Sequence, residues 1–300
     1  MDPTAIDRPR FDALLPPEMA ARAEDTGVRK AGLDTVTLFA LGFLAGAFIS
    51  LGAIFATTVS AGAGDLPFGI VRLVAGLAFS LGLILVVIGG AELFTGNNLI
   101  VMAWASGKVS TGLVLRNWSI VYVGNFAGAI ATVVVLFVSG QYAFGGGSVG
   151  SAALAIGNTK AGLEFVPAVA LGMMCNALVC LAVWLAFSAR TTTDRILAIV
   201  PPIAAFVAAG FEHSVANMYF IPEAIAIRTF APDGFWKSIG RVPADYPNLT
   251  AQGFVSNLVP VTIGNIIGGA LMVGIVYWFV YLRGHRQPAG GDAGRSDPPS

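Results

Sequence analysis

Long apolar runs separated by short polar stretches dominate this sequence. A membrane-spanning helix needs roughly 20 predominantly apolar residues, and six runs qualify: 33–60, 68–104, 113–139, 162–189, 196–221 and 258–282. The composition agrees, because 56% of the residues are hydrophobic and 11% are charged. A soluble domain carries about 25% charged residues. The pattern therefore predicts an all-α polytopic membrane protein with six transmembrane helices.

Two of these runs contain a polar interruption. Residues 92–98 interrupt the second run within GGAELFTGNN, and 212–217 interrupt the fifth within GFEHSVANM. Irregular backbone at membrane depth persists only where protein or a cavity surrounds it. Both runs are therefore predicted to be broken helices, and the amino-terminal end of a half-helix favours an anion there. Gly96 permits backbone states that a Cβ forbids, so the first break is expected to be more mobile than the second, which has Ala216 at this place.

The two halves of the chain repeat each other. KAGLDTVTLFALG at 30–42 matches KAGLEFVPAVALG at 160–172, and NWSIVYVGNFAGA at 117–129 matches NLVPVTIGNIIGG at 257–269. The interruptions at 90–97 and 210–217 align between these matches and share Gly, Glu and Asn. Three crossings per copy place the copies in opposite orientations. We therefore predict an inverted 3+3 repeat with broken helices 2 and 5 and a substrate path near the midplane.

Basic residues predict the orientation. They concentrate in the amino-terminal stretch, in the loops after the second and fourth runs and in the tail. This side is cytoplasmic by the positive-inside rule, so both termini are expected inside, with 140–160 and 222–256 outside. Residues 1–32 then form a cytoplasmic segment without the apolar core of a signal peptide, 33–283 the channel domain and 284–300 a disordered cytoplasmic tail. The net charge of zero gives no sign of nucleic-acid binding.

Three ionisable residues, Glu92, Glu212 and His213, lie deep inside the runs. Such residues cost about 2.5–3.5 kcal/mol on insertion scales and are functional hypotheses by default. The glutamates occupy equivalent places in the repeat, which favours a structural role as acceptors for free backbone N–H groups at each break. His213 has Leu93 as its equivalent, and its apolar surroundings favour a role in the substrate path. His285 lies in the tail and no Cys or carboxylate cluster has ligand spacing, so no metal site is expected.

Each of the other residues near the breaks is consistent with either a structural role or a role in the substrate path. Lys160, at the outer end of the fourth run, is either an interfacial lysine or the cation that attracts an anion to the mouth. Polar residues on the apolar helices either bond neighbouring helices or meet the substrate: Thr95, Asn97, Asn125, Asn176, Asn217 and Asn265. Bulky residues either pack ordinarily or form dry constrictions: Phe79, Leu83, Phe94, Val179 and Phe206.

These motifs resemble the formate/nitrite transporter family. The resemblance rests on GFEHSVANM at 210–218 and ELFTGN at 92–97. Further matches are FDALLPPEMA at 11–20, LVCLAVW at 178–184, IPEAIAIRTFA at 221–231 and LVPVTIGNIIGG at 258–269. The resemblance runs from residue 11 to residue 283 and is strongest toward the bacterial formate channel branch.

The resemblance implies an aquaporin-like fold and a homopentamer with one pore in each protomer. It also implies an outer vestibule with Lys160 and Asn176, and a central His213 opposite Thr95 on the loop of the second run. Two hydrophobic constrictions are implied on either side of the histidine, at Leu83 and Phe94 and at Phe79 and Phe206.

The expected function is a channel or transporter for a small monovalent weak-acid anion in the bacterial cytoplasmic (inner) membrane. Formate is favoured because 232–250 is similar to the formate branch. Nitrite or hydrosulfide is the alternative within the family, and a neutral-solute pore for water or ammonia is another. His213 suits proton exchange near neutral pH, so the anion either crosses as a neutral acid or passes hydrogen-bonded to Thr95 and His213.

The sequence leaves a passive channel and proton-coupled transport both open. It contains no nucleophile–base set, so the protein is not expected to be an enzyme, and no cofactor is expected. The expected partners are the anion, the lipid bilayer and further copies of the chain.

Overall fold

The structure is a computed structural model that describes residues 13–64 and 66–285. Six helices in these ranges are long and apolar enough to cross a membrane: Thr35–Ser60, Phe68–Gly89, Thr111–Ser139, Phe165–Ser188, Thr192–Ala209 and Ala251–Tyr281. The prediction of an all-α protein with six spans is therefore confirmed. Residues 1–12 of the predicted amino-terminal segment, and the predicted disordered tail from 286 onward, lie outside the described residues.

Helices make up most of the described ranges. The α-helices are α1 (Pro16–Ala31), α2 (Thr35–Ser60), α3 (Phe68–Gly89), α4 (Val101–Ala105), α5 (Thr111–Ser139), α6 (Ser148–Ala161), α7 (Phe165–Ser188), α8 (Thr192–Ala209), α9 (Ser214–Phe230), α10 (Asp233–Ile239), α11 (Ala251–Ile266) and α12 (Val276–Tyr281). A π-helix (Ile267–Ile275) joins α11 to α12. Short 3₁₀ helices cover Gly96–Ile100, Gln141–Ala143, Pro243–Asp245 and Arg283–His285.

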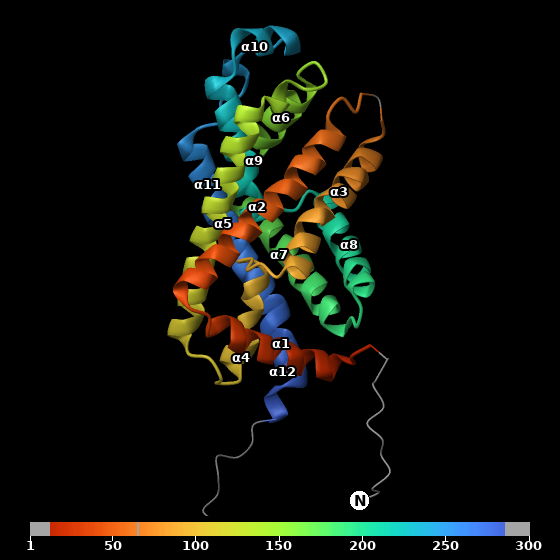
Figure 1. Ribbon diagram of the computed structural model, residues 1–300, viewed down its shortest axis with the longest axis vertical. Helices are drawn as coiled ribbons and strands as arrows, with labels where there is room; N and C mark the ends of the chain where they lie inside the picture. Colours follow the sequence, from red (N-terminus) through yellow and green to blue (C-terminus); the bar gives the residue numbers. More distant parts are fainter. Residues whose placement is uncertain (1–12, 65, 286–300) are drawn as a thin grey trace, which may run out of the picture.

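The helices form an elongated bundle with distinct ends. α6 and α10 lie at one end, and α1, α4 and α12 lie at the other, where α1 runs across the end of the bundle (Figure 1). Because α1 and α12 share one end, the two ends of the described chain lie on the same side, as an even number of crossings requires. That this side faces the cytoplasm stays a prediction.

The inverted repeat appears in the packing of the helices. α2 packs on α5 in the first half, and α7 packs on α11 in the second. A Cβ on Gly42 would lie 3.3 Å from the Cα of Gly124, and a Cβ on Gly172 would lie 3.2 Å from the Cα of Gly264. These glycines occupy equivalent places in the two copies, so the same close backbone approach forms both interfaces.

The repeat also includes the helix that precedes the three spans of each copy, which is α1 in the first copy and α6 in the second. α1 ends one residue after Lys30 and α6 ends one residue after Lys160, and each helix is followed by a glycine. Lys160 therefore lies on a separate helix within the predicted external stretch 140–160, rather than on the fourth span. α9 continues to Phe230, so the stretch predicted to be external from residue 222 begins within a helix.

α1 is firmly attached to the bundle. Its apolar face, which includes Met19 and Ala23, joins the buried cluster around Leu99 and Met102. The buried carboxylate of Glu24 pairs with Lys108 in the loop after α4. This ion pair raises the pKa of the Lys108 ammonium, chiefly through its hydrogen bond to Glu24. The amino-terminal helix is thus packed against α4 and the 3₁₀ turn that follows the first helix break.

Both helix breaks lie where the sequence predicts them, but each starts two residues earlier than expected. α3 ends at Gly89 and α8 ends at Ala209. The residues that follow, Gly90 with φ 81° and Gly210 with φ 79°, adopt the left-handed conformation that favours glycine. Residues 90–95 then separate α3 from a 3₁₀ turn, whereas 210–213 suffice before α9 begins. Gly96 lies inside the 3₁₀ turn, and its φ is not positive. The backbone freedom expected of Gly96 is therefore required of Gly90 instead.

This difference makes a matched pair of substitutions informative. Gly90→Ala is expected to lower stability by about 1–2 kcal/mol, the typical cost of a left-handed backbone for a residue with a Cβ. Nothing lies within 4 Å of the added Cβ, so the cost is conformational alone. Gly96→Ala is expected to be neutral, since its Cβ would meet only Val183 at 3.7 Å. Thermal unfolding of both variants in detergent tests this, and equal midpoints would contradict the assignment of strain to Gly90.

Candidate functional site

A buried glutamate paired with a lysine forms the base of each helix break. Lys30 Nζ lies 2.9 Å from Glu92 Oε1, and Lys160 Nζ lies 2.8 Å from Glu212 Oε1. In each copy the second carboxylate oxygen accepts a hydrogen bond of 2.7 Å from the asparagine five residues later. The glutamates are 5% and 4% exposed. Their charges are therefore balanced by lysines and hydrogen bonds, as buried charges require.

One further asparagine completes each network. Asn97 donates to Asn117, which donates in turn to the carbonyl of Lys30. The same chain of bonds runs in the second copy from Asn217 through Asn257 to the carbonyl of Lys160. Each lysine thus contacts the network through its ammonium group and through its backbone.

The prediction that the glutamates accept backbone N–H groups is wrong. Asparagines from α5 and α11 take that role: Asn125 Oδ1 accepts from the N–H of Phe94, and Asn265 Oδ1 accepts from the N–H of Ser214, both at 2.9 Å. The amide nitrogen of Asn125 donates to the carbonyls of Gly42 and Glu92, and that of Asn265 donates to their repeat equivalents. These two asparagines satisfy the backbone that the breaks leave unpaired.

The two breaks contact each other through Thr95 and His213, and His213 has no equivalent histidine in the first copy. Thr95 Oγ1 lies 2.9 Å from His213 Nε2, and the two residues are 0% and 2% exposed. His213 Nδ1 accepts a hydrogen bond of 3.0 Å from the N–H of Ala216 and so caps α9. A neutral imidazole that accepts at Nδ1 carries its proton on Nε2. Nε2–H therefore donates to Thr95 Oγ1, and the hydroxyl proton of Thr95 is available to another acceptor.

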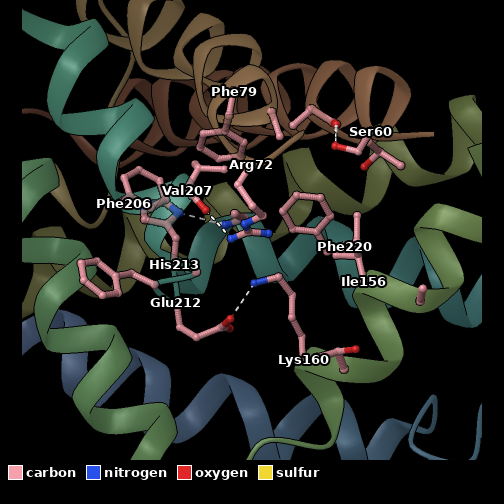
Figure 2. Close-up of a pocket in the computed structure, with 18 of the residues that line it drawn as sticks. Ser60, Arg72, Phe79, Ile156, Lys160, Phe206, Val207, Glu212, His213 and Phe220 are labelled. Atoms are coloured by element: carbon pink, nitrogen blue, oxygen red, sulfur yellow. Dashed lines mark hydrogen bonds and ion pairs between the residues drawn. The ribbon is translucent and has the colours of Figure 1, made fainter. Parts of the chain in front are cut away.

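A cavity of about 450 Å³ leads to His213, and we call it the outer cavity because the predicted orientation puts it on the outside. Figure 2 shows Lys160 and Arg72 projecting into it, with the Lys160–Glu212 ion pair on one side. Arg72 donates to the carbonyls of Val207 and Ala208, at the end of α8. The described charged residues that line this cavity are two cations and one carboxylate, so its charge is net positive.

Lys160 has more bonding capacity left than Lys30. Among the described residues, Lys160 Nζ donates only to Glu212 and lies 5.4 Å from the ring centre of Phe220. Lys30 Nζ, in contrast, bonds both Glu92 and Asn97. Since an ammonium group has three donors, Lys160 keeps donors that a solute in the outer cavity can reach.

An inner cavity of about 380 Å³ lies on the other side of the loop. Its charged lining consists of four cations from α1 and α8 and the carboxylate of Glu92: Arg22, Arg29, Lys30 and Arg195. Leu83, Leu93, Gly96 and Asn97 form its inner wall. Both cavities thus present an excess of positive charge, which raises the local concentration of anions.

Apolar side chains line both cavities near the buried centre. Phe79 and Phe206 meet edge to face at 5.6 Å in the outer cavity, and Phe206 lies 6.0 Å from the ring of His213. Leu83 lines the inner cavity, and Val179 belongs to the same buried cluster. Phe79, Phe206 and Leu83, which the sequence predicted to form constrictions, therefore lie in the cavity walls.

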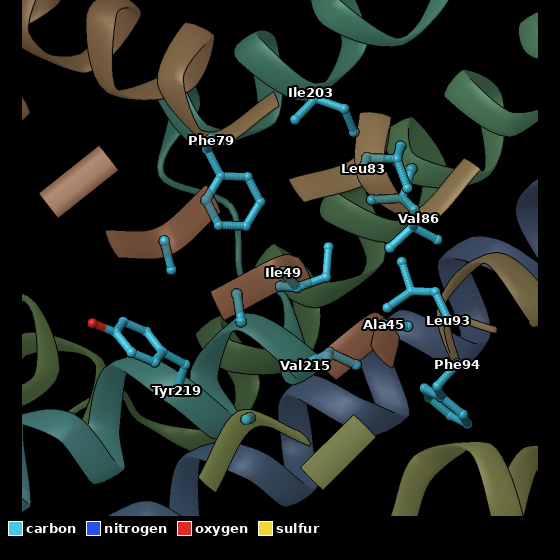
Figure 3. Packing of buried hydrophobic residues seen from close by; sticks show 14 of the residues in the cluster. Ala45, Ile49, Phe79, Leu83, Val86, Leu93, Phe94, Ile203, Val215 and Tyr219 are labelled. Atoms are coloured by element: carbon cyan, nitrogen blue, oxygen red, sulfur yellow. The ribbon is translucent and has the colours of Figure 1, made fainter. Parts of the chain in front are cut away.

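Phe94 does not line either cavity, contrary to the predicted constriction. Its ring lies 4.8 Å from Tyr122 and 6.1 Å from Trp118, on the far side of the loop. Figure 3 shows Leu93 turned toward Val86 while Phe94 points away from them. Leu93 therefore takes the place that the sequence analysis gave to Phe94.

Asn176 is also placed differently from the expected vestibule position. It is fully buried and lines neither cavity. Its amide donates to the carbonyl of Thr95 at 3.3 Å, to Asn98 at 3.0 Å and to the carbonyl of Asn265 at 2.7 Å. Asn176 thus fixes the loop that presents Thr95.

Two cations of the site, Lys30 and Arg72, were not predicted although the sequence contains a signal for each. Lys30 is the repeat equivalent of Lys160 and could have been found from the match between 30–42 and 160–172. Arg72 is a charged residue inside an apolar run, a signal that marks a functional position in a membrane helix. No group of three potential metal ligands occurs within 13–64 and 66–285.

The chain is similar to known proteins over most of its length. The family model described as formate/nitrite transporter matches residues 17–279. The chain is 48% identical over 274 residues to the formate channel FocA of Escherichia coli K12, covering 91% of this chain and 96% of FocA. It is 42% identical to the formate channel FocA of Haemophilus influenzae, covering 88% of this chain and 93% of that protein.

Two solved structures are similar in fold. One, described as a pentameric formate channel with formate bound, superposes with a TM-score of 0.79 at 48% identity and covers 83% of this chain and 98% of its own. The other, an FNT family ion channel, has a TM-score of 0.71 at 28% identity and covers 88% and 98%.

The fold and the site define a class: a multi-pass helical membrane channel for anions. These relatives are channels and transporters rather than enzymes, and this protein is likewise a channel. The chain belongs to the formate/nitrite transporter family.

Proposed function

We propose that this protein is a formate channel of the bacterial cytoplasmic membrane, in which each protomer conducts through its own pore. The observation that carries the proposal is the buried contact between Thr95 and His213, set between two cavities with a net positive lining. The similarity to formate channels, one of them solved with formate bound, supports formate as the anion.

Entry begins with the charges of the cavities. Arg72 and the spare donors of Lys160 attract the anion on the outer side, and the four cations of the inner cavity attract it on the other side. Beyond them the anion meets Phe79 and Phe206, where losing its water is costly for a charged group. A hydrogen bond offered at that point lowers the cost of crossing.

Thr95 and His213 supply that hydrogen bond. His213 Nε2–H donates to Thr95 Oγ1, which makes the Thr95 hydroxyl a stronger donor toward an anion by polarising it. Direct donation of a proton by His213 would need a second proton on Nδ1, which already accepts the N–H of Ala216. The geometry thus favours passage of a hydrogen-bonded anion over transfer of a proton from His213, and hence a passive channel.

The assembly we propose is a homopentamer. One similar solved structure is a pentamer, and several apolar side chains on the surface of α5 are exposed in the single protomer, including Val135 at 71% and Val138 at 79%. Neighbouring protomers and lipid tails are the environments that suit such a surface. The basic residues around α1 and the loop after α4 support the proposal that this end faces the cytoplasm.

Flux measurements in proteoliposomes test the substrate directly. Formate influx is expected to exceed that of protein-free liposomes and to be faster than nitrite influx at equal concentration. The comparison is made across about pH 5–8, because formate has a pKa near that of other carboxylic acids and stays mainly ionised there. Nitrite or hydrosulfide flux above formate flux would reassign the substrate. Water flux without anion flux would overturn the anion assignment.

A further inference from the structure

Glu223 is a buried carboxyl group that the proposed path does not use. It lies on α9, one turn after Tyr219, and is 2% exposed. Its Oε2 atom is enclosed and has no hydrogen-bond partner among the described residues. Buried polar atoms are nearly always bonded to protein or to ordered water, so an unpartnered carboxylate oxygen points to a bound species.

A small cavity lies against this carboxyl group. Its volume is about 10 Å³, which suffices for one water molecule. Besides Glu223, its polar lining consists of Thr57 on α2, Gln141 and Tyr142 on the adjoining 3₁₀ helix, and Tyr219 on α9. A buried water needs two to four polar partners, and this set provides them. The titratable groups that line the cavity are Glu223 and the two tyrosines.

No described cation compensates Glu223. α9 packs against α2, α5, α6 and α11, and α2 and α11 contain no charged residue. The lysine of α6, Lys160, pairs with Glu212, and the arginine of α5, Arg116, donates to groups near the start of α2. On α9 itself, Arg228 donates to two backbone carbonyls of the outer loop. A buried carboxylate without a cation is costly, whereas a neutral carboxylic acid is not.

One residue, Thr57, lies in the wall of both this cavity and the outer cavity, which contains Lys160 and His213. The Thr57 hydroxyl bonds the carbonyl of Ala53 on its own helix, so its orientation is fixed. A proton or a water that passes Thr57 therefore moves between Glu223 and the outer cavity without entering the contact of Thr95 with His213.

We propose that Glu223 is a proton-binding site, held as a neutral carboxylic acid with one internal water and exchanging its proton with the outer cavity past Thr57. The proton comes from water in that cavity: it is bound to a Glu223 carboxylate oxygen at neutral pH and below, and it returns to the water at higher pH. The bound proton keeps a negative charge away from the outer entrance of the channel, where an arriving anion would meet it. Only this last role rests on the proposed function.

Infrared spectroscopy of the purified protein tests the site itself. The difference spectrum of wild type minus Glu223→Gln at neutral pH is expected to contain the carbonyl stretch of a neutral carboxylic acid. That band is expected to shift when the sample is transferred to D₂O, since the site exchanges with the cavity, and to move in Tyr219→Phe, since the water loses a partner. A carboxylate band in its place, or a carbonyl band that never shifts in D₂O, would overturn the proposal.

Two further variants keep the test decisive if Glu223→Gln does not assemble. Glu223→Met removes the group but keeps an apolar side chain of similar length, so the wild type minus Glu223→Met spectrum should show the same band. Thr57→Val keeps the shape of the wall and removes its hydroxyl, and it is expected to slow the D₂O shift without removing the band. An unchanged exchange rate in Thr57→Val would refute the route past Thr57.

Transport gives an independent readout of the role. Raising the outside pH of proteoliposomes above neutral is expected to reduce formate influx about twofold more in wild type than in Glu223→Gln, because only the wild type gains a carboxylate there, while influx at neutral pH stays equal. An equal reduction would refute the role in transport. If the infrared band is present but no variant or wild type conducts formate, the site stands and the proposed function fails.

Discussion

Replacing His213 with Asn is expected to reduce formate influx about tenfold or more. Asn is a good helix N-cap and can still accept the N–H of Ala216, which His213 Nδ1 does in the native protein. Its shorter side chain does not reach Thr95, so the contact of 2.9 Å is lost. A hydrogen bond to a charged group is worth about 1.5–3 kcal/mol, and about 1.4 kcal/mol corresponds to a tenfold change in rate. Radiolabelled formate uptake into proteoliposomes measures the effect.

Substitutions at Thr95 provide the matched controls. Thr95→Val keeps the shape and removes the hydroxyl, so it is expected to reduce influx as strongly as His213→Asn. Thr95→Ser keeps the hydroxyl and is expected to conduct like wild type. Both variants should assemble normally, because the backbone carbonyl of Thr95 still accepts the bond from Asn176. Wild-type influx in both His213→Asn and Thr95→Val would show that the central contact does not take part in conduction.

Replacing Lys160 with Met is expected to have the largest effect on stability. It leaves the carboxylate of Glu212, whose side chain is 5% exposed, buried without its cation. Breaking a buried ion pair by removing one partner costs about 3–5 kcal/mol, and the 17% exposure of the Lys160 side chain places the expected loss near the lower end. Thermal unfolding of the purified oligomer in detergent measures the loss.

The double variant Lys160→Met with Glu212→Gln separates the charge from the packing. A neutral amide at residue 212 can still bond Asn217, so the double variant is expected to recover most of the lost stability. The repeat supplies a second comparison, because Lys30→Met breaks the equivalent pair with Glu92. The Lys30 side chain is 28% exposed, so solvent compensates Glu92 better and the loss should be smaller. A double variant as unstable as Lys160→Met alone would show that the charge of Glu212 is not the cause.

The apolar runs, the repeat and the two breaks could be predicted from the sequence. Membrane-spanning helices follow from the length and apolarity of local segments, which need no information about their neighbours. The repeat is a property of the order of residues, and it placed Glu92 and Glu212 in equivalent surroundings before any contact was known. The position of Thr95 opposite His213 was implied by the resemblance of the two break motifs to a known family, and the structure brings both side chains into contact.

The side chains around the breaks needed the tertiary structure. Leu93 and Phe94 are adjacent apolar residues on a non-helical segment, where no period tells which one faces the pore. The bond from the N–H of Phe94 to Asn125 sets the direction of that segment, and so turns Leu93 toward the inner cavity. Asn176 lies on the apolar helix α7. Its side chain is completely buried because the first loop and the π-helix region pack against α7.

Pairing across the fold was likewise undetermined by the sequence alone. Lys30 and Lys160 lie in amphipathic or polar stretches that predict an exposed cation. In the structure each forms an ion pair with a buried carboxylate, 62 and 52 residues away respectively. Glu223 lies in a stretch that its charges and prolines assigned to an external loop, but α9 continues through it and carries its carboxyl group into the bundle. Local composition determined which segments enter the membrane. Which charges meet inside it was decided by the packing of the two inverted copies, because the partners come from different helices and share no period along the chain.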